Sequence, residues 1–240
     1  MNKLDLKSVF PLFQASLEDA ADVCDFPCVF CGNDTQPRFE LGIGADIITS
    51  CTPCGELLAL DADDRKGGSC PRCKKVVAFP LTTQGPLSCC ANCLREGRAA
   101  ITKDTELGMV TWEHAKSGWT HGLPGRIPVG WEVSEPNADG WRQVKVDRSF
   151  ITELLRTPTY STIQGDQWLF CCRAPMNFIG TWSRERFVHE AIGGDGRDLF
   201  NKIVERAVPG LWEDRLHDVT GIYVFQCSQC LKRRAHCDIA

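Results

Sequence analysis

The stretch SCTPCGELLALDADDRKGGSCPRCKK, residues 50–75, carries two C-x-x-C pairs on either side of a short polar loop. Two intervening residues let a tight turn present both sulfurs to one ion, and four thiolates complete the tetrahedron that zinc prefers. The two pairs lie 15 residues apart, which is within the spacing typical of one zinc site. The sequence therefore predicts a zinc ribbon over about residues 45–80, with four ligands: Cys51, Cys54, Cys70 and Cys73.

Two further C-x-x-C pairs flank this inner ribbon. A nested arrangement, in which Cys28/Cys31 and Cys90/Cys93 close a second site around it, is favoured because the inner ribbon is self-contained. In the sequential alternative, Cys28/Cys31 and Cys51/Cys54 together bind one ion, and Cys70/Cys73 and Cys90/Cys93 together bind the other. Either pairing leaves no open coordination position, which is typical of structural zinc. Two zinc sites are expected, with the outer ligands Cys28, Cys31, Cys90 and Cys93.

The composition indicates a globular protein, because 43% of the 240 residues are hydrophobic and 9% aromatic. The first residues, MNKLDLKSVFPLFQ, lack the basic and apolar regions of a signal peptide, and no apolar run has the length of a membrane span. We therefore expect a cytoplasmic protein that contacts no membrane. Disulfides do not persist there, so the repeated C-x-x-C pairs among the 15 cysteines indicate metal ligation by thiolates.

The charge balance disfavours a dedicated nucleic-acid binder. The formal net charge is -4 and the pI about 5.8, whereas phosphate binding depends on Lys and Arg. The tip of the inner ribbon, residues 61–66, carries three aspartates against Arg65 and Lys66. We therefore expect this ribbon either to contact a protein partner or to serve only to stabilise the fold. An acidic chain suits a basic protein partner.

Residues 101–147 form a Trp-rich segment in which Gly and Pro predict turns and short strands. Its tryptophans are interpreted first as core aromatics, with an exposed patch for a partner as the alternative. His114 and His121 have no carboxylate or nucleophile at a diagnostic spacing. The tryptophans of this segment are Trp112, Trp119, Trp131 and Trp141.

The fold class predicted is α+β. A zinc-binding region over residues 1–100, a zinc-ribbon segment with an inserted second ribbon, precedes the Trp-rich extended segment over 101–147. An α+β C-terminal domain follows over 148–240, because DRSFITELLRT, SRERFVHEA and RDLFNKIVERAV have helical periodicity and GIYVFQC is a clear strand.

The last C-x-x-C pair, Cys227/Cys230, supplies only two ligands. Buried thiols without metal are the favoured interpretation, and a third zinc site is the alternative. Its missing ligands would be His236 or Cys237, or the neighbouring pair Cys171 and Cys172. The basic residues that follow are too few for a nucleic-acid footprint: Lys232, Arg233 and Arg234.

Four stretches, FPCVFCG, CANCLREGRAA, RTPTYSTIQGDQWLFCCRAPMNFIG and YVFQCSQCLK, resemble the CbrC-like family of poorly characterised bacterial proteins. The resemblance supports the nested pairing, since the inner ribbon looks like an insertion between the family's early and middle C-x-x-C pairs. The chain departs from the family pattern after Trp168: the family tends to carry His-Cys and a further Cys, and this chain has Cys171, Cys172 and then Met176. The resemblance implies a role in bacteriocin tolerance.

No Gly-rich phosphate loop, nucleophile elbow or H-E-x-x-H motif occurs in the sequence, so we expect no catalytic residues and no enzyme. The function expected from the resemblance is a zinc-stabilised immunity protein in bacterial competition. It would bind and neutralise a protein toxin, with a nuclease effector as one candidate, by non-catalytic contact. The alternatives are a zinc-ribbon protein that binds nucleic acid or acts in transcription, and a zinc hydrolase, which would need an open coordination position.

Overall fold

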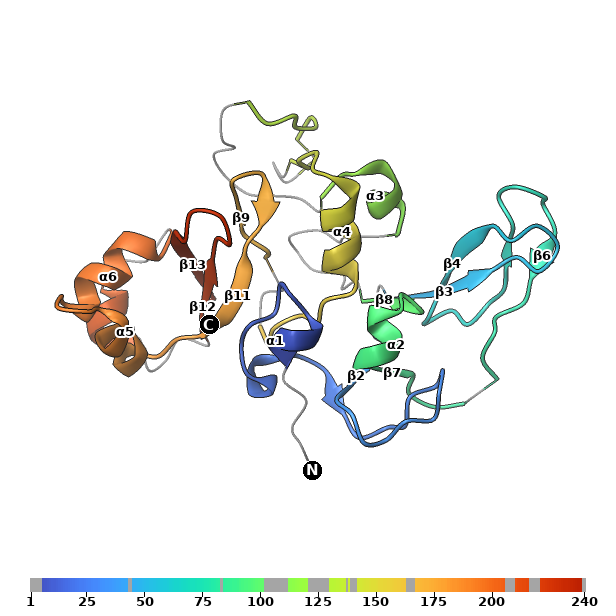
Figure 1. The fold of residues 1–240 in the computed structure, drawn as a ribbon, viewed down its shortest axis with the longest axis horizontal. Helices are drawn as coiled ribbons and strands as arrows, with labels where there is room; N and C mark the ends of the chain where they lie inside the picture. The colour runs from blue at the N-terminus through green and yellow to red at the C-terminus, as the bar shows by residue number, and fades with distance from the viewer. Residues whose placement is uncertain are drawn as a thin grey trace.

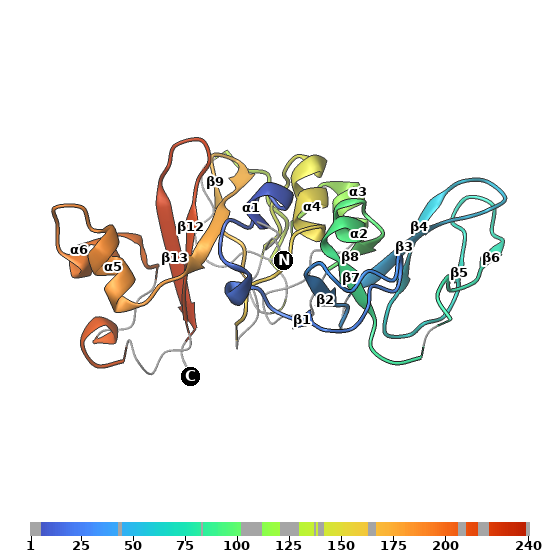
Figure 2. The same cartoon turned by 60° about the horizontal axis from the view of Figure 1, so that its bottom comes forward.

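The structure is a computed structural model, and it has a mixed α+β fold of short helices and small sheets. The strands of the inner ribbon lie at one end of the molecule and helices α5 and α6 at the other (Figures 1 and 2). The structure describes residues 6–42, 45–82, 84–101, 112–120, 130–136, 138, 142–162, 167–205, 210–215 and 221–238.

The N-terminal part builds an antiparallel sheet in the order β1–β2–β7. Strand β7 enters α2 directly, and Arg38 on β2 lies opposite Cys90 on β7. This sheet therefore brings the pair Cys28/Cys31 next to the pair Cys90/Cys93, about sixty residues later in the chain. The elements are α1 (Leu6–Val9), η1 (Leu17–Asp19), β1 (Val23–Cys24), β2 (Arg38–Glu40), β7 (Ser88–Cys90) and α2 (Ala91–Arg95).

The inner ribbon is an insertion between β2 and β7. Its β3–β4 hairpin is antiparallel, and β8 pairs with the other edge of β3. Four buried residues form a small hydrophobic cluster of the ribbon's own: Cys51, Leu58, Leu60 and Cys70. The elements are β3 (Asp46–Ser50), β4 (Leu57–Asp61), β5 (Gly68–Ser69), β6 (Val76–Val77) and β8 (Ala99–Ala100).

The C-terminal part carries a hairpin, β9–β10, and a three-stranded antiparallel sheet in the order β11–β12–β13. Asp147 and Ser183 cap α4 and α5 by accepting hydrogen bonds from the first-turn amides. The elements are α3 (Trp112–Ser117), α4 (Arg148–Leu155), β9 (Phe170–Cys171), β10 (Ala174–Pro175), β11 (Asn177–Thr181), α5 (Arg184–Glu190), α6 (Gly196–Ile203), η2 (Leu211–Arg215), β12 (Gly221–Gln226) and β13 (Arg233–Asp238).

The largest buried cluster joins the two ends of the chain. Phe13 forms a bridge to Phe178 on β11, and Tyr160 stacks on Phe178 with ring centroids 4.7 Å apart. Phe39 and Phe225 belong to the same cluster. A second cluster lies where α5 and α6 cover the sheet. The domain boundaries at residues 100 and 147 stay a prediction.

The described part of the Trp-rich segment includes a short helix, α3, that the expectation of turns and strands did not include. Ala115 on this helix packs against α4, so a tertiary contact stabilises it. Trp112, Trp119 and Trp131 are half-buried, and the Trp131 ring meets Phe170 edge-on at 6.3 Å. Trp141 and His121 lie outside the described residues.

The negative charge of the ionised Asp46 carboxylate is unfavourable in the folded state. Asp46 lies opposite Asp61 across β3–β4, and burial, Asp61 and Glu113 raise its pKa to about 6. The folded state therefore holds this proton more tightly than the unfolded state, so stability falls as pH rises from about 4 to about 6. We expect Asp46→Asn to raise the melting temperature at about pH 7.5 and to remove this fall between about pH 4.5 and 6. Thermal unfolding at these three pH values, with Asp63→Asn as an exposed control, tests this; equal slopes for Asp46→Asn and wild type would contradict it.

Candidate metal centres

Three groups of four cysteines are brought together among the described residues, and in each group the four Sγ atoms lie within 4.8 Å of one another. The eight thiols of the first four C-x-x-C pairs are grouped as in the nested pairing and not as in the sequential one. The first centre is Cys28, Cys31, Cys90 and Cys93; the second is Cys51, Cys54, Cys70 and Cys73; the third is Cys171, Cys172, Cys227 and Cys230.

The separations between sulfurs fit a tetrahedral metal ion such as zinc. With a metal–sulfur bond of about 2.3 Å, the sulfurs of a regular tetrahedron lie about 3.8 Å apart, whereas a disulfide joins them at about 2.0 Å. All 15 cysteines lie in the described part of the chain, and none forms a disulfide. The Sγ–Sγ distances are 3.7 Å for Cys31–Cys90, 3.5 Å for Cys51–Cys73 and Cys54–Cys70, 3.7 Å for Cys171–Cys230 and 3.8 Å for Cys171–Cys172.

Four of the C-x-x-C pairs share one turn. The amide after the second cysteine donates to the carbonyl of the first, and the amide of the first donates to the carbonyl five residues on. The residue after the second cysteine has a positive φ, which holds both sulfurs on one side of the turn. The first of these hydrogen bonds, with its length and the φ of the donor residue, runs from Gly32 to Cys28 (2.7 Å, 70°), from Gly55 to Cys51 (2.7 Å, 72°), from Lys74 to Cys70 (2.9 Å, 61°) and from Leu231 to Cys227 (3.0 Å, 59°).

Substitution of Gly32 tests this turn. A Cβ at Gly32 would meet nothing within 4 Å, so Gly32→Ala adds only the cost of a left-handed backbone, about 1 kcal/mol. We expect chemical denaturation of Gly32→Ala to show a free energy of unfolding lower by this amount, with the metal content unchanged. Gly194→Ala is the matched control, since Gly194 has no positive φ and only one distant neighbour. Equal effects of the two substitutions would contradict the requirement for a positive φ.

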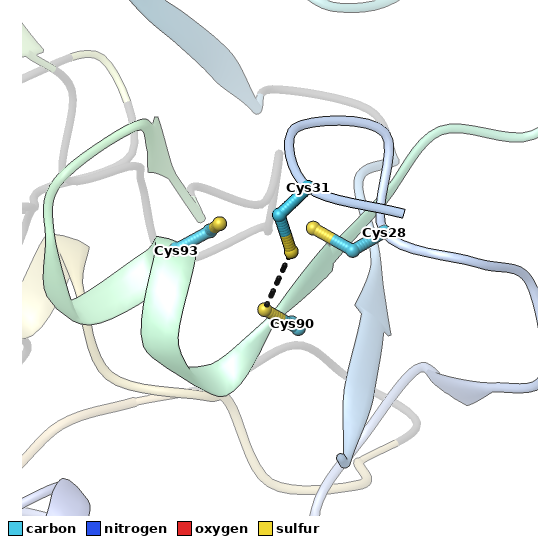
Figure 3. A group of neighbouring side chains, drawn as sticks. All are labelled: Cys28, Cys31, Cys90 and Cys93. Carbon is cyan, nitrogen blue, oxygen red and sulfur yellow. Dashed lines mark hydrogen bonds between the residues drawn. The ribbon is translucent and has the colours of Figure 1, made fainter. Parts of the chain in front are cut away.

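The first centre joins a turn to a strand end and a helix (Figure 3). Cys90 is the last residue of β7 and Cys93 lies in the first turn of α2, while Cys28 and Cys31 come from the turn after β1. Cys31 is exposed, and the other three are buried. A hydrogen bond from the buried Cys89 thiol lowers the pKa of Cys28 to about 3, whereas burial raises the pKa of Cys90 and of Cys93. A bound cation would allow all four to stay deprotonated.

The second centre joins the two C-x-x-C turns of the inner ribbon. Cys51 and Cys70 are fully buried. Burial raises the pKa of Cys51 to about 12, while the Cys73 amide lowers the pKa of Cys70 to about 6. Without a cation, therefore, the four thiols do not all ionise at neutral pH, and a metal ion would supply the missing charge compensation.

The third centre differs in part from the favoured interpretation of the last cysteine pair as buried thiols. Cys227 is buried, but Cys230 is exposed and lies with Cys171 and Cys172 in a group that could hold a metal ion, as in the alternative interpretation. His236 does not join the group: its Nε2 lies 2.8 Å from the Tyr160 hydroxyl. Cys237 also lies outside it. Of the missing ligands that the sequence offers, the adjacent pair Cys171 and Cys172 completes the group, because a tight hairpin turns it toward the β12–β13 loop.

Ion pairs within the chain neutralise part of the charge on both charged surfaces considered in the sequence. In the basic trio, Arg233 pairs with Glu190 at 3.0 Å, and Arg234 pairs with Glu205. At the ribbon tip, Lys66 pairs with Asp64 at 2.5 Å. The trio therefore offers a nucleic acid little free positive charge, and the exposed tip remains mostly acidic.

Comparison with known proteins places the chain in a family. No curated protein and no solved structure matches it. Within the described residues, no helix has the length and apolar character needed to cross a membrane. A family model described as an uncharacterised protein family (UPF0167) matches residues 54–239, a range that contains the whole third centre and parts of the other two. The chain belongs to this uncharacterised protein family, UPF0167.

Proposed function

We propose that this chain is a zinc-stabilised immunity-type protein that binds and neutralises a bacterial toxin by non-catalytic contact. The observation that carries the proposal is the make-up of the three centres, since each has four cysteine ligands. Four thiolates fill a tetrahedral zinc ion and leave no position for water or substrate, the pattern of structural sites. The class of partner comes from the resemblance to the CbrC-like family.

The acidic tip of the inner ribbon is the contact surface that we favour. Asp61, Asp63 and Asp64 are exposed there, on the turn that follows β4 at the end of the β3–β4 hairpin nearest β8. A basic toxin, such as a nuclease, would be attracted by this charge and by the net charge of -4.

The tryptophans support a structural role rather than a contact patch. The ammonium groups of Lys116 and Lys145 lie over the rings of Trp112 and Trp119, at 5.7 and 5.4 Å. Trp131 packs against the main core. The described tryptophans of this segment thus have intramolecular partners, which leaves the ribbon tip as the stronger candidate.

Affinity capture tests the proposal. The tagged, zinc-loaded protein is used as bait in bacterial lysate at low and high salt, beside an Asp63→Lys/Asp64→Lys variant. We expect one stoichiometric protein partner that is toxic when expressed alone and harmless when co-expressed with this chain. The variant should capture it more weakly, chiefly at low salt, because steering by charge is screened. A partner that is not toxic, or whose toxicity co-expression leaves unchanged, would contradict the proposal.

The zinc-ribbon alternative has one observation in its favour. Arg72, Lys74 and Lys75 are exposed around the second C-x-x-C turn of the inner ribbon. Under this alternative, the same capture would retain nucleic acid at low salt, release it as salt rises, and fail in an Arg72→Glu/Lys74→Glu/Lys75→Glu variant.

A further inference from the structure

We propose that the third centre binds its metal ion exchangeably, whereas the first and second centres hold theirs as structural ions. The third centre lies between two hairpin loops, where β9–β10 approaches the turn between β12 and β13 (Figures 1 and 2). This inference concerns metal chemistry alone and does not depend on the toxin partner.

Access to the ligands separates the three centres. Cys172 and Cys230 are exposed and Cys171 is half-buried, so one side of the third centre faces solvent. The first centre has one exposed ligand, and the second has none. A competing thiol or chelator must approach the metal before a ligand can leave, and the surrounding shell controls that approach. The third ion is therefore the most open to exchange.

The backbone of the third centre is also strained. Cys171 pairs with Ala174, so Cys172 and Arg173 are the two central residues of the β9–β10 turn. Their φ angles are 51° and 61°, values that this kind of turn usually meets with Asn-Gly. Neither residue is glycine, so the turn is held against a steric cost. Part of the energy gained on metal binding offsets that cost, which lowers the affinity of the third centre.

Among the residues that the structure describes, few other contacts hold the tip of this turn. The Cys172 carbonyl accepts a long hydrogen bond of 3.5 Å from Gln229 Nε2, and Arg173 donates to the Gly130 carbonyl at 3.0 Å. The metal ion would thus be the main support for Cys172. When the ion leaves, we expect the turn to relax.

The base of the hairpin is anchored, so relaxation stays local. Phe170 and Ala174 are buried, and the Trp168 indole donates to the Met176 carbonyl at 2.8 Å. Strands β12 and β13 pair along six positions. The third ion can therefore leave while the sheet persists. By contrast, three cysteines of the first centre, Cys28, Cys90 and Cys93, belong to the main core, whereas of the third centre Cys227 alone does, with Cys171 packed against it.

An all-cysteine site of this kind takes zinc and other thiophilic ions, such as Cu(I). The test uses zinc itself. The full chain is loaded with zinc and mixed with a colorimetric chelator, and zinc release is followed over time. We expect one equivalent to leave at least about tenfold faster than the others, a difference of the size that shell effects produce. This fast phase should be absent from Cys172→Ser/Cys230→Ser and unchanged in Cys237→Ser, whose thiol lies outside the group.

Hydrogen exchange supplies a second readout. After release of the fast equivalent, amides of residues 170–175 and 227–232 should lose protection, while those of β11 and the main core keep theirs. Release of all zinc in one phase would overturn the proposal. So would a fast phase that persists in the double variant, or equal zinc contents of the double variant and the wild type.

The strain argument has its own test, which removes no ligand. Arg173→Gly and Arg173→Ala both delete the contact with Gly130, and they differ only in their tolerance of a positive φ. We expect Arg173→Gly to release the fast zinc equivalent more slowly than Arg173→Ala. Equal rates, or the reverse order, would contradict a strained turn.

Discussion

Replacing Cys90 by Ser is expected to abolish cooperative folding of the protein. Cys90 is 1% exposed and belongs to the largest buried cluster, where β7 passes into α2. Structural zinc supplies about 10–16 kcal/mol of binding free energy. A domain of ordinary stability has only about 5–15 kcal/mol in total. Loss of one ligand of the first centre should therefore remove the free energy that keeps the core folded.

Circular dichroism and elemental analysis measure this outcome. Cys90→Ser should lose the ion of the first centre and its sharp thermal transition. Cys89→Ser is the matched control, because Cys89 is equally buried and adjacent but lies outside the group, and serine keeps a donor toward Cys28. The control should retain the full metal content and a cooperative transition. A Cys90→Ser variant with full zinc and wild-type melting would show that the first centre does not stabilise the fold.

Replacing Cys54 by Ser is expected to unfold the inner ribbon alone. The ribbon buries a cluster of only four residues, two of which are metal ligands, Cys51 and Cys70. So small a core does not fold without additional support, and in zinc fingers the metal supplies it. Residues 51–77 should therefore lose structure, while the clusters outside the ribbon remain.

Hydrogen exchange with mass spectrometry separates the local effect from a global one. In Cys54→Ser, amides of residues 51–77 should exchange at the rate of an unfolded chain, and one zinc ion should be lost. Amides of β11, β12 and β13 should keep their protection. Lys75→Ser, at an exposed position of the same ribbon, should change neither. Preserved protection in the ribbon of Cys54→Ser would contradict a metal-dependent fold.

Local chemistry explains what the sequence could predict. The C-x-x-C spacing defines a turn within a few residues, so the four turns and the grouping of the inner cysteines follow from short-range geometry. The α4 and α5 helices also follow from local signals, namely apolar periodicity and the side chain of Ser183 as a cap.

Tertiary contacts account for what the sequence could not decide. The sequence allows Cys171 and Cys172 as ligands of a third site but does not select them, because only the approach of two hairpins brings them to a pair more than fifty residues later. The pairing of Arg233 with Glu190 likewise depends on α5 covering the sheet. Helix α3 exists because it packs against α4, whereas the surrounding Gly and Pro residues indicate turns.

X-ray absorption spectroscopy at the zinc edge, on the purified protein, tests the central claim most directly. The proposal rests on centres that are filled by cysteine alone, so every zinc ion should show four sulfur neighbours at about 2.3 Å and no lighter ligand. A mean of three sulfurs with an oxygen or nitrogen neighbour would contradict the account. It would reveal an open coordination position and favour zinc-dependent hydrolysis over a structural role.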